Sequence, residues 1–259
     1  MSEPIQIPDS FAVPGEVAAK RVVITGAGRG LGALLAHAFS SAGASVALVA
    51  RTERDLKAVA ELLPGPSLVL AGDVTHEDFN EAVADAVARE WGGLDVWICN
   101  AGISPIVAGP RQTDAAVWRQ IMEVNLTGAF LGARAAAGVM SPGGRLIFTG
   151  SVLGERPRKG LAAYSASKAG LTGLAKSLAL DLAPAGITVN VVAPGWFDSP
   201  LARDWRSNPK LEASIVGHTA LARWGAPGDL TGAYQFLASD AAGYVTGSVL
   251  TVDGGYLLV

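Results

Sequence analysis

Seven short apolar runs, separated by segments of helical character, constrain this chain more than any other feature. They are RVVIT (21–25), SVALVA (45–50), SLVLAG (67–72), LDVWICN (94–100), RLIFTG (145–150), ITVNVVAP (187–194) and SVLTVDG (248–254). Most are apolar at nearly every position, which is typical of parallel strands buried on both faces. Because parallel strands need crossover connections, the alternation predicts one α/β domain, a doubly wound parallel sheet with helices on both faces.

Residues 1–19 precede this pattern and differ from it in composition. They are polar and proline-bearing, and predict a loosely held N-terminal arm before a domain of residues 20–259. They lack a basic segment followed by an apolar core, so we expect no signal peptide. The uncharged run at 30–50 is long enough to suggest a membrane span. Two serines and a glycine within 40–43 instead divide it into a helix and a strand.

Charge and cysteine content exclude some kinds of partner. The net charge of −3 provides no basic field for nucleic acid. The single cysteine, Cys99, lies in an apolar strand pattern and is expected in the core. One cysteine cannot form an intramolecular disulfide and suits a reducing compartment. We therefore expect a cytoplasmic protein with neither a membrane nor a nucleic-acid partner.

A glycine-rich turn follows the first strand directly. The segment TGAGRGLG places Gly26, Gly30 and Gly32 between a strand and a helix, together with Arg29 and Leu31. Glycine at these positions permits a tight turn and a close approach of the backbone to a pyrophosphate. The N-terminus of the helix would then face the anion. In this context the turn predicts a dinucleotide-binding site.

The end of the second strand indicates which dinucleotide is bound. Arg51 stands where such folds place either an acid for the ribose hydroxyls or a base for a 2′-phosphate. Arg29 lies in the glycine turn, and a guanidinium suits a phosphate by charge and by its forked donors. These residues favour NADP(H). Glu53 is an acid close to the same strand end, so NAD(H) stays a possible cofactor. Arg51 and Arg54 could also be solvated residues at the start of a helix, without a role in binding.

Later strand ends are expected to complete the cofactor site, since the carboxyl ends of parallel strands line the ligand crevice. Asp73 could accept a hydrogen bond from an adenine amino group, or it could cap the next helix. Gly102 would let the backbone approach the adenosine ribose. The neighbouring expected contacts are Val74, Asn100 and Ala101.

Tyr164 and Lys168 lie four residues apart in a run with apolar residues at helical spacing. They would therefore share one face of a helix. A nearby cation lowers the pKa of a phenol, which makes such a pair a candidate general acid/base. Ser151, at the end of an apolar strand, adds a hydroxyl that could hydrogen-bond a carbonyl oxygen. Alone, the tyrosine–lysine spacing is better explained by chance.

The ordered set of motifs is more specific than any one of them. TGAGRGLG, NAG at 100–102, Asn125 in VNLTG, Ser151, YSASK at 164–168, PGWFDSP at 194–200 and VDGG at 252–255 follow one another. Over residues 20–259 the chain resembles the short-chain dehydrogenase/reductase family in its soluble form. Within the family it is similar to bacterial gluconate 5-dehydrogenases and 3-oxoacyl-carrier-protein reductases. The resemblance implies a Rossmann fold and a nicotinamide cofactor.

The resemblance also implies roles for individual residues. Asn125, Ser151, Tyr164 and Lys168 would form the catalytic group, which includes no metal. Lys168 would also hold the nicotinamide ribose, and Asn125 a water linked to Lys168. The segment with Pro194, Gly195, Phe197 and Ser199 would contact the cofactor; the family often has threonine where Ser199 stands. An asparagine in mid-helix can also mark a local backbone irregularity, so Asn125 has a structural alternative.

Residues 197–223 are expected to form a substrate lid within the domain. They are more polar than their surroundings, and closing segments exclude water from a reaction. A plain pair of surface helices is the alternative. The loop residues Arg156, Arg158 and Lys159, with Arg203 and Arg206 on the lid, could steer an anionic substrate or could simply be solvated.

The substrate is expected to be a small carbonyl or alcohol compound. By resemblance it would be a sugar acid of the gluconate kind or a 3-oxoacyl thioester. The family commonly assembles as tetramers or dimers, so a homotetramer or homodimer is expected. A cofactor-binding regulatory or scaffold protein without turnover is the alternative function. The complete serine, tyrosine and lysine set favours an enzyme.

Overall fold

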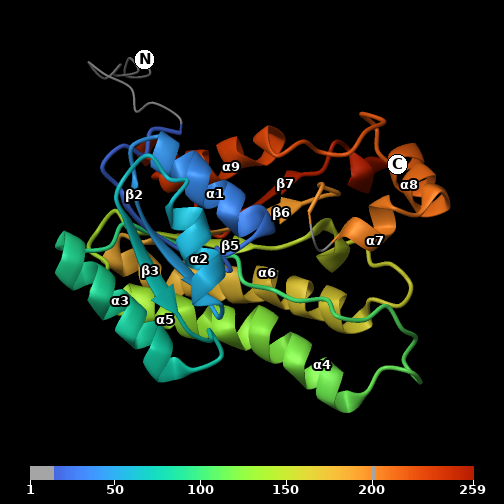
Figure 1. Ribbon diagram of the computed structural model, residues 1–259, viewed down its shortest axis with the longest axis horizontal. Coiled ribbons are helices and arrows are strands. Elements are labelled where there is room, and N and C mark those ends of the chain that lie inside the picture. The colour runs from blue at the N-terminus through green and yellow to red at the C-terminus, as the bar shows by residue number, and fades with distance from the viewer. Residues whose placement is uncertain (1–14, 200–201) are drawn as a thin grey trace, which may run out of the picture.

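The computed structural model describes residues 15–199 and 202–259. Figure 1 shows a sheet between two layers of helices. All strand pairs are parallel, in the order β3-β2-β1-β4-β5-β6-β7. The strands are β1 (Arg21–Thr25), β2 (Ser45–Ala50), β3 (Ser67–Ala71), β4 (Val96–Cys99), β5 (Arg145–Thr149), β6 (Thr188–Pro194) and β7 (Val249–Val252). The predicted doubly wound, Rossmann-like sheet is confirmed, with each strand in its predicted run.

Helices cover both faces of the sheet. One face carries α3 (Glu77–Trp91), α5 (Gly128–Val139) and α6 (Ala162–Leu182). The other carries α1 (Gly30–Ser41), α2 (Glu53–Ala60) and α9 (Gly228–Ala238). The remaining α-helices are α4 (Ala115–Met122), which leads into α5, and α7 (Arg203–Arg206) and α8 (Pro209–Gly217), which follow β6.

Burial on both faces explains why the strands are apolar at successive positions. In β1, Val22 and Ile24 pack with Phe39 of α1, whereas Val23 packs in the cluster that contains Val83 of α3. Successive strand residues point to opposite faces, so a sheet covered by helices on both sides needs apolar residues at every position. Each face buries its own core.

Several smaller expectations can be compared with the structure. The uncharged run at 30–50 forms α1 and β2, and no helix in the described ranges is long and apolar enough to cross a membrane. Cys99 is free and buried, and burial raises the pKa of its thiol. Residues 1–14 of the expected arm lie outside the described residues. Within its last part, Val17 is buried in the core, which differs from a loosely held arm.

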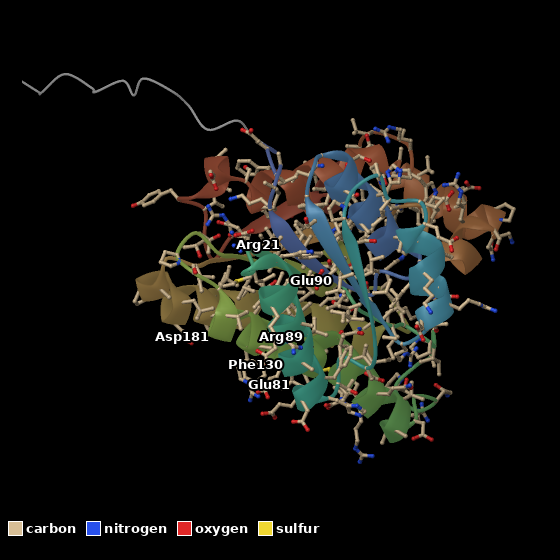
Figure 2. All side chains as sticks on the ribbon, turned by 60° about the vertical axis from the view of Figure 1, so that its left-hand side comes forward. Arg21, Glu81, Arg89, Glu90, Phe130 and Asp181 are labelled. Atoms are coloured by element: carbon tan, nitrogen blue, oxygen red, sulfur yellow. The ribbon has the colours of Figure 1, made fainter. Side chains whose placement is uncertain are left out.

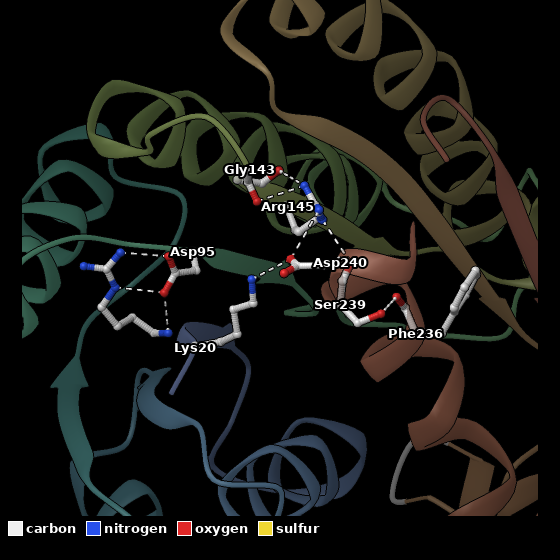
Figure 3. A network of polar contacts seen from close by, with 9 residues as sticks. Lys20, Asp95, Gly143, Arg145, Phe236, Ser239 and Asp240 are labelled. Carbon is white, nitrogen blue, oxygen red and sulfur yellow. Dashed lines mark hydrogen bonds and ion pairs between the residues drawn. The ribbon is translucent and has the colours of Figure 1, made fainter. Parts of the chain in front are cut away.

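Ion pairs fasten the amino ends of the central strands. The carboxylate of Asp95, just before β4, accepts hydrogen bonds from the Arg21 backbone N–H at 2.8 Å and from its guanidinium Nη2 at 2.7 Å. The Arg145 guanidinium donates to the Ser239 carbonyl at 3.3 Å, and Lys20 donates to Asp240 at 2.8 Å (Figure 3). These contacts join β1, β4, β5 and the end of α9.

The outer surface of α3, α5 and α6 carries both charged and apolar side chains. Glu81, Arg89 and Asp181 lie on this side together with Phe130, whose exposed fraction is 39% (Figure 2). Arg134 of α5 pairs with Glu81 and with another glutamate of α3. Leu180 of α6 is also exposed, by 78%, so Phe130 is not the single apolar side chain on these helices.

Replacing Asp95 by asparagine tests how much the contacts between Asp95 and Arg21, here called the clasp, contribute to the stability of the protein. The hydrogen bonds from Arg21 hold the pKa of the Asp95 carboxyl below its ordinary value, although burial opposes this. Hydrogen bonds to charged groups contribute about 1.5–3 kcal/mol each. We expect Asp95→Asn to lower the free energy of unfolding at pH 7 by about that amount, measured by urea denaturation.

The pH dependence gives a second readout. Because the folded-state pKa of Asp95 is depressed, its stabilisation is present above the unfolded value of about 3.9 and is lost as pH falls through the folded value. The difference between wild type and Asp95→Asn should therefore shrink below about pH 4. The exposed Asp181→Asn is the control, expected within about 0.5 kcal/mol of wild type. Equal stability of both variants would contradict the clasp.

Candidate active site

One cavity of about 1170 Å³ runs along the carboxyl ends of the strands. It lies where the strand order reverses between β1 and β4, the usual place for a ligand in this class of sheet. Of the predicted site residues, Asn125 alone does not border it. Those that do are Gly26, Arg29, Gly30, Leu31, Gly32, Arg51, Asp73, Val74, Asn100, Ala101, Gly102, Ser151, Tyr164, Lys168, Pro194, Gly195, Phe197 and Ser199.

The glycine turn brings backbone against backbone. Gly26 has a φ of 70°, and a Cβ on Gly32 would lie 2.2 Å from the Gly26 carbonyl oxygen. Any side chain at position 32 would therefore push α1 away from the end of β1. Because α1 packs so closely, its first turn forms one wall of the cavity.

The N-terminus of α1 is open to an anion. Arg29 precedes the helix without making a side-chain capping hydrogen bond, and no acidic residue lies in the first turn. The first amide groups of a helix carry partial positive charge and seek acceptors. With glycines clearing the approach, these groups fit the pyrophosphate of a dinucleotide.

Hydrogen bonds tie the strand ends beneath the cavity. The Thr25 hydroxyl accepts from the Asn100 amide at 2.9 Å and the Ala101 amide at 3.0 Å. The Asn100 side chain donates to the Thr25 carbonyl at 2.9 Å and accepts from the Thr149 hydroxyl at 3.3 Å. The Asn100 side chain thus orders the cavity floor, a role that its position at a strand end did not reveal.

The second and third strands bring polar groups to one end of the cavity. The side chains of Arg29 and Arg51 make no hydrogen bond or ion pair within residues 15–199 and 202–259, so both guanidinium groups are free to meet a ligand. Asp73 accepts from the amide and hydroxyl of Thr75 at 3.0 Å and 2.9 Å. Burial opposes ionisation of Asp73, but these hydrogen bonds and the charge of Arg51 leave its pKa below the ordinary value. Since α3 begins later, at Glu77, Asp73 stabilises the preceding turn and does not cap the helix.

Tyr164 and Lys168 share a buried face of α6, as predicted. The Lys168 ammonium donates to the Thr149 carbonyl at 2.7 Å and lies 5.7 Å from the centre of the Tyr164 ring. Burial lowers the pKa of Lys168 to about 8, so the ammonium is still charged at neutral pH. Thr149, which the sequence analysis missed, positions this lysine from the strand end next to Ser151.

The electrostatics of Tyr164 differ from the expectation. Burial raises the pKa of the phenol, and a hydrogen bond with Ser151 lowers it only in part. The sequence suggested that Lys168 would lower this pKa, but burial dominates, and the group that opposes it is Ser151. At neutral pH the tyrosine is a protonated hydrogen-bond donor beside the serine hydroxyl.

Asn125 lies behind the cavity, fully buried, in a π-helical turn (Glu123–Thr127) between α4 and α5. Its carbonyl oxygen accepts from the Ile103 amide at 2.8 Å, and its amide donates to the Ile103 carbonyl at 3.0 Å and the Ser167 hydroxyl at 3.1 Å. The backbone irregularity that the sequence offered as an alternative is therefore present. Asn125 fastens the loop after β4 to α6, next to Lys168.

The other end of the cavity is mainly apolar, although Asp198, next to the aromatic residues, also borders the cavity. It is bordered by Ile103, Val152, Leu153, Leu161, Trp196 and Trp205. The predicted lid contributes to it through Ala202 and Trp205, whereas residues 200 and 201 lie outside the described residues, as does the side chain of Arg203. Arg156, Arg158 and Lys159 do not border the cavity.

Comparisons with known proteins agree with this arrangement. Residues 26–257 match a family described as enoyl-(acyl carrier protein) reductase. The chain is 38% identical over 250 residues to cis-4-hydroxycyclohexanecarboxylate dehydrogenase of Sinomonas cyclohexanicum, covering 95% of this chain and 100% of that one. It is 36% identical over 242 residues to the 3-oxoacyl-[acyl-carrier-protein] reductase FabG of Escherichia coli, covering 93% and 98%.

A solved structure shows the same fold with a cofactor. A protein from Beutenbergia cavernae, assigned as an NAD(P)-dependent gluconate 5-dehydrogenase and solved with NADP at low occupancy, superposes with a TM-score of 0.87. The identity is 33%, and the alignment covers 95% of this chain and 100% of that one. The chain therefore belongs to the short-chain dehydrogenase/reductase family, whose members transfer hydride between NAD(P) and an alcohol or carbonyl group.

Proposed function

We propose that the protein interconverts a ketone and a secondary alcohol, with Tyr164 as the general acid/base. The observation that carries this proposal is the convergence of Tyr164, Ser151 and Lys168 on the cavity that also contains the uncapped N-terminus of α1. A candidate general acid, a hydrogen-bond donor for an oxyanion, and the glycine turn that could bind a cofactor therefore border the same cavity. These are the groups that the reduction of a carbonyl compound requires.

Each residue has a distinct part in the proposed reaction. The Ser151 hydroxyl holds the carbonyl oxygen, or the alkoxide forming there. Tyr164 donates its proton to that oxygen in reduction and removes it in oxidation. Lys168, held by the Thr149 carbonyl, presents a positive charge beside the ring and would hold the ribose of a bound nicotinamide. The nicotinamide supplies or accepts the hydride.

Asn125 acts through other groups. Its contacts to Ile103 and Ser167 keep the loop after β4 against α6. A Cβ on Gly102 would lie 3.5 Å from both the Asn125 oxygen and the Lys168 nitrogen, so these atoms are near one another. A water held there by Asn125 would connect Lys168 to solvent.

The cofactor is proposed to be NADP(H). The free guanidinium groups of Arg51 and Arg29 border the end of the cavity formed by β1 and β2. Both can meet a 2′-phosphate with charge-assisted hydrogen bonds. Glu53, which left NAD(H) open, is paired with Lys57 at 2.8 Å and does not border the cavity. This pairing supports NADP(H) over NAD(H).

Sugar acids and 3-oxoacyl thioesters are the substrates that the sequence suggested. A polyhydroxylated acid needs several hydrogen-bond partners, whereas the end of the cavity beyond Tyr164 is lined mainly by apolar side chains. This lining favours an apolar carbonyl compound over a sugar acid. The homotetramer or homodimer and the cytoplasmic location stay predictions.

Replacing Tyr164 by phenylalanine tests the acid/base assignment. The change removes only the hydroxyl, so folding and cofactor binding should be retained. We expect kcat to fall by at least about 10²-fold, the usual effect of losing a positioned proton donor. Steady-state oxidation of NADPH with a ketone measures this. Tyr244→Phe, at a fully exposed position, is the matched control and should retain activity. A near-normal kcat in Tyr164→Phe would refute the assignment.

Replacing Arg51 by aspartate tests the choice of cofactor. The variant loses one attraction for the 2′-phosphate and gains a carboxylate that repels it and suits ribose hydroxyls. We expect wild type to prefer NADPH over NADH by about 10²-fold in kcat/KM, and the variant to shift toward NADH. Arg54→Asp, at an exposed position outside the cavity, should leave the preference unchanged. Equal use of both cofactors by wild type would overturn the role of Arg51.

The lid proposal for residues 197–223 predicts a difference in local opening. Segments that close over a site are commonly mobile without ligand. Backbone amides of α8 should therefore exchange hydrogen faster than those of β1 in the free protein, and should slow when NADPH is added. Hydrogen exchange with mass spectrometry measures both. Exchange in α8 as slow as in β1 without cofactor would favour a fixed pair of surface helices.

A further inference from the structure

Four aromatic side chains form a cluster at the apolar end of the cavity. The ring centroid of Trp196, just after β6, lies 5.3 Å from that of Trp205 in α7, 5.8 Å from that of Trp224 and 6.3 Å from that of Tyr256. Trp196 and Trp205 border the cavity. Their ring planes are inclined by 53°, so the two indoles form an angled wall.

Arg158 sits behind this wall, on the loop between Ser151 and Tyr164. Its guanidinium carbon lies 5.4 Å from the Trp196 ring centroid and 5.3 Å from that of Trp205. One terminal nitrogen, Nη2, donates to the Ser214 hydroxyl of α8 at 3.2 Å. Arg158 therefore joins three segments, namely its own loop, the residues after β6, and the α7–α8 region.

The second terminal nitrogen of Arg158 shows why the contact of the guanidinium with the two indole rings matters. Nη1 is buried and has no hydrogen-bond partner. A buried cationic donor normally needs a partner. The electron-rich faces of two indoles can supply this stabilisation, since a guanidinium over an aromatic ring is attracted by the quadrupole of the ring. The two indoles thus stabilise the charge of Arg158 without neutralising it.

The neighbouring arginines are also engaged away from the substrate. Arg156 donates to the Tyr256 carbonyl at 2.7 Å and lies over the Tyr256 ring. Arg206 lies over the Trp224 ring and pairs with Asp198 at 3.6 Å. In the described part of the chain, the cations that border the cavity are Arg29 and Arg51 near β2, and Lys168 at the catalytic group.

We infer that Arg158 fixes Trp196 and Trp205 as a specificity wall, and that this wall selects uncharged, apolar ring ketones and the corresponding secondary alcohols. The inference rests on the proposed carbonyl and alcohol activity. A flat apolar ring can lie against an indole face and be held by dispersion and by the loss of hydrated surface. Val152, Leu153 and Leu161 supply the remaining apolar contacts. Arg158 is a positioning residue and does not touch the substrate.

This assignment differs from the one that charge alone would suggest. An arginine beside an active site could bind a carboxylate of the substrate directly. Here the guanidinium lies over the two indoles and does not border the cavity. Within the described part of the chain no cationic side chain is among the residues at the apolar end, so a carboxylate bound there would lose its hydration without gaining a cation from them. The wall should therefore disfavour anions.

A matched pair of substrates distinguishes the two assignments. Methyl 4-oxocyclohexanecarboxylate is neutral, and 4-oxocyclohexanecarboxylate is its anionic counterpart of similar size. With wild type and NADPH, we expect the neutral ester to have the higher kcat/KM by about tenfold or more, since its ring enters an apolar pocket without a charge to dehydrate. A higher kcat/KM for the anion would overturn the inference.

Variants at position 158 test the role of the guanidinium. Arg158→Met keeps an apolar side chain but loses the contacts to both indoles and to Ser214. We expect KM for the neutral ester to rise about tenfold, with kcat changed less than about threefold and KM for NADPH unchanged. The anion should lose as much as the ester. A loss confined to the anion would show instead that Arg158 binds the substrate directly.

Controls separate the wall from general effects of charge and folding. Lys159→Met removes the same charge one residue away, from an exposed side chain outside the cavity, and should leave both KM values unchanged. Trp205→Leu should also raise KM for the ester, and the double variant Arg158→Met/Trp205→Leu should show less than the product of the two effects. If the effects of the two substitutions on KM multiply, Arg158 does not act through Trp205, and the inference is refuted. If Arg158→Met does not fold, Arg158→Lys and Trp205→Leu provide the same comparison.

Further substrates separate failure of this inference from failure of the proposed function. 5-Ketogluconate represents sugar acids, and acetoacetyl-N-acetylcysteamine represents oxoacyl thioesters. Turnover of either one without turnover of ring ketones would overturn the specificity wall and leave the carbonyl activity intact. Absence of NADPH-dependent turnover with every probe would refute the proposed function itself and favour a cofactor-binding protein without turnover.

Discussion

Hydrogen bonds between the carboxyl ends of three strands are the contacts on which the rest of the site depends. The Thr25 hydroxyl joins β1 to the chain after β4, and the Asn100 side chain extends the connection to Thr149 of β5. The carbonyl of Thr149 then accepts from Lys168 of α6. One chain of contacts therefore sets the distance between the glycine turn and the catalytic helix. Displacing the end of one strand would therefore move the glycine turn relative to Tyr164.

The two ends of the sheet have different tasks. At the amino ends, the charged side chains Arg21, Asp95 and Arg145 are paired with neighbouring groups and hold the strands together. At the carboxyl ends, Arg29, Arg51 and the first turn of α1 retain donors without protein partners. Arg29 and Arg51 are exposed, so water can solvate their guanidinium groups until a ligand meets them. The well-paired end thus stabilises a fold whose other end is kept ready for binding.

Local pattern was sufficient to predict the fold and most of the cavity. Strands buried on both faces are apolar at each position, and glycine is needed where α1 touches the end of β1, so both leave a mark in adjacent residues. The residues that a long polar side chain contacts cannot be predicted from its neighbours in the sequence. Arg158 was expected to face solvent or an anion, but its guanidinium lies over both Trp196 and Trp205, which are distant from it in the sequence. Thr149 was missed for the same reason, because its role depends on where α6 packs.

Burial of Tyr164 links proton transfer to the occupancy of the cavity. In the apolar surroundings the phenol keeps its proton, since burial raises its pKa more than Ser151 lowers it. This state suits donation of a proton to a carbonyl oxygen but not its removal from an alcohol. A positive charge placed in the cavity beside the ring would stabilise the phenolate, and in a low-dielectric site its effect would be larger than in water. Lys168 alone, at 5.7 Å and engaged with Thr149, does not reverse the balance. The acid/base strength of Tyr164 is therefore set jointly by α6 and by whatever charge lies next to it, so that removal of a proton from an alcohol depends on a loaded site.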